Sequence, residues 1–103
     1  MEEKREFLVY VDPDLEKLVP KFILAQKAQF ELMKEALKNL KYEELKLLGH
    51  RMKGSCGGYG FLLLGELGET IEKAAEAKDF NLLKNGLARL EVCFSNLKVE
   101  YRK

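Results

Sequence analysis

The stretch LKLLGHRMKGSCGGYG, residues 45–60, decides how this chain folds and where a reactive side chain would lie. Its apolar residues recur every three or four positions, which is the spacing of one buried face of an α-helix. They are Leu45, Leu48, Met52 and Cys56. The glycines within 57–60 then end the helix, because glycine weakens helix interiors and suits left-handed exits. At about 100° per residue, His50 falls roughly 150° from the middle of the apolar face. We therefore expect the only histidine of the chain to point away from the core.

Similar patterns predict further helices on both sides of this stretch. Asp12 and Pro13 suit the cap and the first position of a short helix, and Asp79 suits the cap of a late one. Pro20 should separate the short helix from the long one that follows. The ranges expected to be helical are 13–18, 20–39, 42–56, 61–78 and 80–98. Four substantial helices joined by short loops predict an all-α fold, an antiparallel up-down-up-down four-helix bundle with a short extra N-terminal helix.

The two ends of the chain lie outside these helices. Residues 7–11 alternate briefly and predict a short extended segment. Since a second strand is not evident, we expect residues 1–12 to pack as an N-terminal arm across the bundle. The tail, 99–103, should pair with this arm or pack near it. Residues 1–103 are expected to form a single domain.

Buried stripes are predicted on the remaining helices too. In the long helix they should run along Phe30, Met33, Leu37 and Leu40. In the last two helices they should run along Leu64, Leu67, Ile71, Ala74 and Ala75, and along Leu83, Leu87, Leu90 and Phe94.

Composition excludes several classes of function. The 18 basic and 17 acidic residues give a formal net charge of +1, without the basic surplus that nucleic-acid binding requires. Two cysteines, Cys56 and Cys93, are too few for a disulfide scaffold and are expected to be reduced and packed in the core. No apolar run approaches the length of a membrane span, and the acidic N-terminus does not resemble a secretory signal. We expect a cytoplasmic protein that binds neither nucleic acid nor membrane.

The predicted neighbours of His50 on the helix surface favour contact with another protein. They are Lys46, Leu47, Lys53, Gly54 and Gly57. Two are cations, two lack side chains, and one is an apolar residue outside the core stripe. This pattern predicts a docking patch with a histidine at its centre. The alternative is an ordinary surface histidine on a helix that is rich in glycine near its end.

A carboxylate hydrogen-bonded to Nδ1 would leave Nε2 of His50 free as a nucleophile. The following helix should run antiparallel, so an acid level with His50 lies about as far beyond the glycine turn. The candidates are Glu66, Glu69, Glu72 and Glu76. Glu72 flanks the inward stripe of its helix and is the best choice, whereas the others point further outward. The alternative is that Glu72 pairs on the surface with Lys73 or Arg89.

The run from His50 to Phe61 resembles the signature of histidine-containing phosphotransfer domains, a pattern His-x-(Leu/Met)-Lys-Gly-Ser followed by small residues and Gly. The positions are filled by His50, Met52, Lys53, Gly54, Ser55 and Gly60. The entry at 12–15, the kink at 19–22 and the segment 71–75 are also similar to that family. The resemblance implies a four-helix bundle with an exposed phosphorylated histidine and no kinase or ATP-binding activity. It also implies that an acid or amide 22 positions after the histidine, here Glu72, hydrogen-bonds the imidazole.

The resemblance leads us to expect a carrier of a two-component phosphorelay and not an enzyme. His50 would accept a phosphoryl group from a receiver aspartate, Lys53 would stabilise its charge and Glu72 would orient the ring. Lys46, Leu47, Gly54 and Gly57 would contact the partner, a receiver domain of a response regulator or hybrid histidine kinase. We expect a monomer without metal or cofactor of its own, with Mg²⁺ supplied by the receiver.

Two other functions are compatible with parts of the sequence. The first is a helical-bundle module that binds receiver or kinase domains without being phosphorylated. Such a module would need the apolar patch around Leu47 but not His50 together with Lys53. The second is an enzyme, such as a phosphohistidine phosphatase or a kinase fragment. Nucleotide binding is unsupported, because no glycine-rich phosphate loop stands between a strand and a helix.

Overall fold

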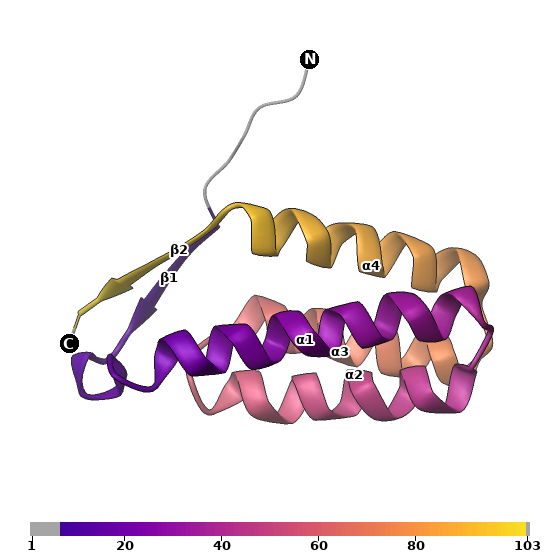
Figure 1. Ribbon diagram of the computed structural model, residues 1–103, viewed down its shortest axis with the longest axis horizontal. Helices are drawn as coiled ribbons and strands as arrows, with labels where there is room; N and C mark the ends of the chain where they lie inside the picture. The colour runs from indigo at the N-terminus through magenta and orange to yellow at the C-terminus, as the bar shows by residue number, and fades with distance from the viewer. Residues whose placement is uncertain (1–6, 103) are drawn as a thin grey trace, which may run out of the picture.

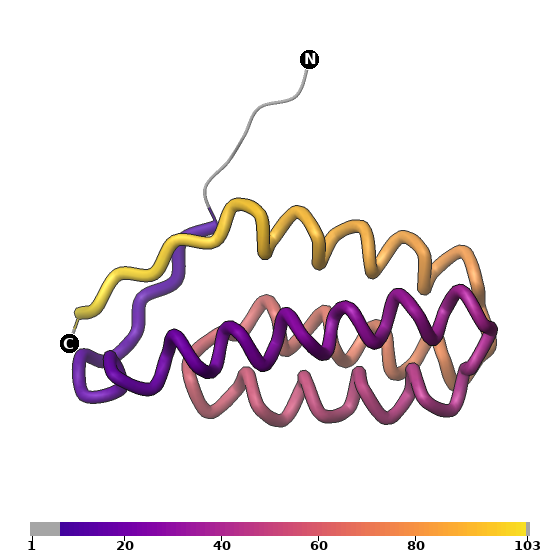
Figure 2. The backbone as a smooth tube through the Cα atoms, in the orientation of Figure 1, coloured from indigo at the N-terminus to yellow at the C-terminus, as the bar shows by residue number. Residues whose placement is uncertain are grey.

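The computed structural model describes residues 7–102, and four helices that lie along the length of the molecule make up most of it (Figure 1). The first six residues of the predicted N-terminal arm lie outside this part of the chain, as does Lys103 of the tail. The helices are α1 (Val19–Lys38), α2 (Tyr42–Gly57), α3 (Leu62–Glu76) and α4 (Phe80–Ser95). The backbone turns back at each short connection between successive helices (Figure 2). The predicted four-helix bundle is therefore confirmed.

The helix starts follow the predicted caps, with one change. Asp79 caps α4 by accepting a hydrogen bond from the backbone N–H of Leu82 at 3.1 Å, and Asp12 accepts one from Asp14 at 2.9 Å. The short helix expected at 13–18 is only a 3-10 turn, η1 (Pro13–Leu15). Pro20 lies in the first turn of α1, where its missing N–H leaves no helical hydrogen bond unmade. The proline therefore begins the long helix rather than breaking a longer one.

The prediction of an all-α chain without a second strand is wrong, because the two ends of the chain pair. Strands β1 (Phe7–Val11) and β2 (Leu97–Tyr101) form a two-stranded parallel sheet in which Phe7 lies opposite Leu97 and Val11 opposite Tyr101. The pair extends from the end of the bundle where α4 stops (Figure 1). The last helix ends at Ser95 and not near residue 98, because the backbone from residue 97 onward makes strand hydrogen bonds instead. Of the two expectations for the tail, pairing with the N-terminal segment or packing near it, the structure shows the pairing.

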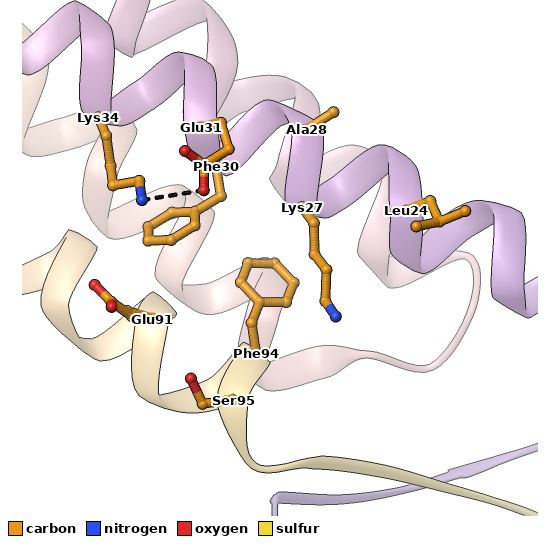
Figure 3. Close-up of a pocket in the computed structure, with 9 residues that line it drawn as sticks. All are labelled: Leu24, Lys27, Ala28, Phe30, Glu31, Lys34, Glu91, Phe94 and Ser95. Atoms are coloured by element: carbon orange, nitrogen blue, oxygen red, sulfur yellow. Dashed lines mark ion pairs between the residues drawn. The ribbon is translucent and has the colours of Figure 1, made fainter.

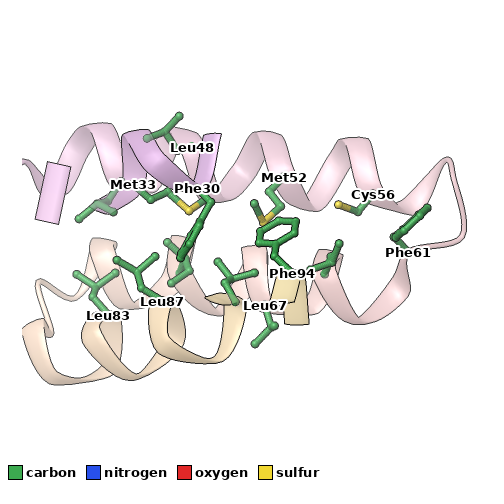
Figure 4. Close-up of a cluster of buried hydrophobic side chains, with 14 of the residues drawn as sticks. Phe30, Met33, Leu48, Met52, Cys56, Phe61, Leu67, Leu83, Leu87 and Phe94 are labelled. Carbon is green, nitrogen blue, oxygen red and sulfur yellow. The ribbon is translucent and has the colours of Figure 1, made fainter. Parts of the chain in front are cut away.

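The core is formed by the predicted apolar faces, and side chains from the helices point toward one another across it (Figure 4). Leu45, Leu48, Met52 and Cys56 are all buried, as are the inward residues predicted for α3 and α4. Leu40 is the exception, because it is 57% exposed and has a φ of 55° in the turn after α1. A left-handed residue ends a helix and turns the chain, so the buried stripe of α1 stops at Leu37.

The two cysteines are both free thiols. Cys56 is fully buried, and this burial raises the pKa of its thiol to about 12. Cys93 is only half-buried, so the expectation of a core position holds for Cys56 and in part for Cys93. Within residues 7–102, no helix combines the length and the apolar character needed to cross a bilayer.

The paired strands should contribute to stability, and this can be tested at Val11, which is 2% exposed. We predict that Val11→Ala lowers the free energy of unfolding by about 1–3 kcal/mol, because it removes buried methyl groups and leaves a cavity. Chemical denaturation followed by circular dichroism would measure the change. Leu8→Thr in the same strand is the control, since Leu8 is 37% exposed, and it should stay within about 0.5 kcal/mol of wild type. Equal losses in both variants would show that the strand does not pack as described.

Candidate functional site

His50 lies on the solvent side of α2, opposite the stripe that packs into the core. Its side chain is 66% exposed, whereas Met52, two residues further along the helix, is completely buried. This difference follows from the helix period, which places neighbouring residues on different faces. The imidazole can therefore be reached by another molecule without any change in the bundle.

The imidazole is held by one carboxylate from the next helix. Nδ1 of His50 lies 3.1 Å from Oε2 of Glu72 on α3, and the Glu72 side chain is only 22% exposed. A carboxylate oxygen in this position can accept a hydrogen bond from a protonated Nδ1. In the tautomer that carries its proton on Nδ1, the lone pair is on Nε2, the nitrogen on the opposite side of the ring from Glu72. The contact therefore joins Nδ1 to the carboxylate and leaves Nε2 on the side of the ring away from Glu72.

The hydrogen bond belongs to a row of three cross-helix pairs between α2 and α3. Lys46 lies 3.6 Å from Glu76, His50 lies 3.1 Å from Glu72, and Lys53 lies 3.5 Å from Glu69. Steps of four and three residues up α2 are matched by the same steps back along α3, so these two helices run antiparallel. The row places a cation on either side of the histidine.

The third carboxylate of the row, Glu69, has a second cation within reach. Lys73, considered above as an alternative partner for Glu72, lies 3.3 Å from Oε2 of Glu69 instead. A hydrogen bond from Lys73 and the positive charges of Lys53 and Lys73 hold the pKa of Glu69 below its ordinary value. Glu69 therefore remains ionised in the neutral range.

Two glycines let α2 and α3 approach closely at the level of His50. A Cβ atom added to Gly49 would lie 2.7 Å from the carbonyl oxygen of Gly68 and 2.8 Å from the backbone nitrogen of Glu72. A Cβ added to Gly68 would lie 2.9 Å from the carbonyl oxygen of Gly49. These contacts are with backbone atoms, which cannot move aside as a side chain can. The glycine pair therefore sets the distance across which Glu72 reaches His50.

The predicted docking residues lie on the same exposed side of α2. Lys46 and Leu47 line a shallow hollow together with His50, Glu72 and Glu43, and Leu47 is 48% exposed. Further along the helix, a Cβ built on Gly54 or Gly57 would have no atom within 4 Å among residues 7–102, apart from its chain neighbours and the nearby backbone of its own helix. The histidine thus has a hollow with an apolar residue on one side and an open, glycine-lined helix surface on the other.

Sequence reasoning did not single out the glycine pair or the link from Glu69 to Lys73. The available signal for the glycines was their position inside a helical pattern, where glycine is unfavourable unless packing requires it. Glu69 was considered only as a partner for the histidine. Its spacing of four residues from Lys73 is the ordinary one for a helical ion pair and does not by itself indicate a role.

A second hollow lies between α1 and α4, away from the histidine (Figure 3). The rings of Phe30 and Phe94 form part of its wall, and Lys34 pairs with Glu31 at 3.0 Å. Its lining includes no histidine or cysteine that could accept a phosphoryl group. In the part of the chain that the structure describes, no three His, Cys, Asp or Glu side chains gather as a metal site.

The glycine contact predicts opposite effects of alanine at two positions of α2. Gly49→Ala should lower the free energy of unfolding by about 1–3 kcal/mol, because the added methyl group pushes the two backbones apart. Gly54→Ala should raise it by about 0.5–1 kcal/mol, because the site is open and alanine favours the helix. Denaturation curves would measure both, and nitrogen NMR of the ring would report whether Nδ1 of His50 still donates in each variant. A Gly49→Ala protein as stable as wild type would contradict the close approach.

Comparison with protein families matches residues 17–98 to the Hpt domain. Neither the comparison with curated proteins nor that with solved structures gives a match. The matched residues cover most of the chain and include all four helices, His50 and Glu72. Hpt domains are phosphotransfer carriers of two-component signalling, they are not kinases, and they interact with receiver domains. The chain belongs to the Hpt domain family.

Proposed function

We propose that this chain is a phosphorelay intermediate that accepts a phosphoryl group on His50 from the aspartyl phosphate of one receiver domain and passes it to the aspartate of another. The observation that carries this proposal is the exposed imidazole with Nδ1 engaged by Glu72 at 3.1 Å. A ring held in this way presents Nε2 to solvent as a nucleophile.

The transfer requires no general base on this chain. The lone pair of Nε2 forms a bond to phosphorus while the bond between phosphorus and the aspartate oxygen breaks, and the carboxylate leaves with that electron pair. Nδ1 keeps its proton throughout, so the ring becomes positively charged and Glu72 stabilises that charge at 3.1 Å. In the reverse step the electrons of the N–P bond return to Nε2 and restore the same tautomer.

The surface around His50 supports docking of a partner with a phosphorylated pocket. The transition state of phosphoryl transfer spreads negative charge over the equatorial oxygens, so catalysis is mainly positioning and electrostatics. Lys53, one turn from His50, would neutralise part of that charge. Lys46 and Leu47 would contact the partner, and Gly54 and Gly57 would leave room for its loops. The Mg²⁺ of the reaction would come with the receiver.

His50→Gln tests the phosphoryl acceptor. We expect this variant to take no label from a phosphorylated receiver while its stability stays within about 0.5 kcal/mol of wild type, because the side chain is outside the core. The chain would be incubated with a panel of receiver domains loaded with acetyl phosphate, and acid-labile phosphate on it followed over time. Labelling of His50→Gln would show that the acceptor is another residue. A wild-type chain that binds receivers but takes no label would be an interaction module instead.

Glu72→Ala tests the carboxylate that orients the ring. It should slow single-turnover transfer about ten- to hundredfold, since one hydrogen bond to a charged group contributes about 1.5–3 kcal/mol. Glu72→Gln is the matched variant, because its amide oxygen can still accept from Nδ1 although it lacks the charge. We expect Glu72→Gln to retain more of the rate than Glu72→Ala, and both rates would be measured across the neutral pH range. A wild-type rate and pH profile in Glu72→Ala would remove Glu72 from the mechanism.

A further inference from the structure

Lys53, the residue proposed to stabilise the phosphoryl charge, already pairs with a carboxylate in the structure. Its ammonium group lies 3.5 Å from Oε2 of Glu69 on α3. The same oxygen lies 3.3 Å from Nζ of Lys73, one helical turn further along α3. One carboxylate oxygen is therefore shared by two lysines, of which one, Lys53, is on the helix of the histidine and the other is on the helix of the carboxylate.

We propose, building on the proposed function, that Glu69 is a positioning residue that competes with the phosphoryl group for Lys53, and that Lys73 weakens this competition by holding Glu69 from the other side. We call this arrangement of Glu69, Lys53 and Lys73 the carboxylate latch. In the unphosphorylated chain Lys53 rests on Glu69. When His50 carries phosphate, Lys53 turns to the phosphoryl oxygens and Glu69 keeps Lys73 as its partner.

The latch differs from the other two pairs of the row in its surplus cation. Glu72 is taken by the ring of His50 and Glu76 lies beside Lys46, whereas Glu69 has two lysines within 3.5 Å. Removal of Lys53 from Glu69 therefore leaves that carboxylate with a partner. Lys73 can keep its contact with Glu69 when Lys53 leaves, because these two residues are four apart on the same helix and their pairing does not depend on α2.

Exposure makes the exchange of partners feasible. The side chains of Lys53, Glu69 and Lys73 are 46%, 38% and 74% exposed, so all three can move without repacking the core. Exposed ion pairs are individually weak, so a phosphoryl group with about two negative charges is a stronger partner for Lys53 than Glu69 is. The latch thus determines how strongly Lys53 stabilises the phosphorylated state. Through this stabilisation it shifts the equilibrium between phosphohistidine and phosphoaspartate.

The proposal predicts shifts of this equilibrium in opposite directions. Glu69→Gln should move it toward phosphohistidine by about two- to fivefold, the range expected from the strength of an exposed ion pair. Lys73→Gln should move it toward phosphoaspartate by a similar factor, because Glu69 then binds Lys53 alone. The measurement is the ratio of the two phosphorylated species at equilibrium with the receiver domain that labels the wild-type chain fastest, loaded with acetyl phosphate and freed of excess donor.

Matched variants separate the latch from a general effect of charge. Glu66→Gln removes one negative charge from the same helix, at an exposed residue for which the described structure shows no ion pair, and should leave the equilibrium unchanged. In a Lys53→Ala background neither Glu69→Gln nor Lys73→Gln should have a further effect, since the lysine they act through is gone. Lys73→Arg keeps the positive charge at this position and should retain the wild-type ratio of the two phosphorylated species.

Several outcomes would overturn the latch. If the wild-type chain takes label but Glu69→Gln has the same equilibrium, the latch is wrong and the proposed function still stands. If Glu69→Gln still shifts the equilibrium in the Lys53→Ala background, the latch is also wrong, because Glu69 would then repel the phosphoryl group directly. A wild-type chain that takes no label from any receiver would overturn the proposed function and the latch together.

Discussion

The close contact of the α2 and α3 backbones at Gly49 and Gly68 is the constraint on which the site depends. A hydrogen bond of 3.1 Å between side chains on two helices requires a fixed distance and register between those helices. Here the fit is so close that a Cβ at Gly49 would lie 2.8 Å from the backbone nitrogen of Glu72. The residue that binds the imidazole is therefore attached to the point where the helices touch.

The sequence predicts the part of this arrangement that depends on one helix at a time. The stripe from Leu45 to Cys56 gives the helix phase, and the phase alone places His50 on the exposed side. Glu72 could be found as well, because a count of residues on either side of the glycine turn leaves four glutamates and the phase of their helix favours Glu72. Both inferences use only the helix period and the length of a single connection, which are local properties of the chain.

The features that the sequence did not predict each depend on two segments that are far apart along the chain and meet only in the folded structure. The distance between α2 and α3 is set jointly by Gly49 and Gly68, and neither residue indicates its partner. The tail was expected near the N-terminal segment, but its strand β2 and the parallel register with β1 were not, because a strand of five residues has no pattern that indicates a parallel partner. The same holds for Glu69, whose importance lies in being shared by lysines of two helices.

Two glycines of α2, Gly49 and Gly54, differ in whether packing inside the molecule requires them. Gly49 has a reason in packing, because any side chain there would meet the backbone of α3. Gly54 has no such reason, since no other described part of the chain would meet a Cβ there and alanine would stabilise the helix by about 0.5–1 kcal/mol. A glycine that weakens its own helix without such a contact fits the proposed docking of a partner, which would need room there. One turn beyond the exposed imidazole, that is where a partner carrying an aspartyl phosphate would have to come close.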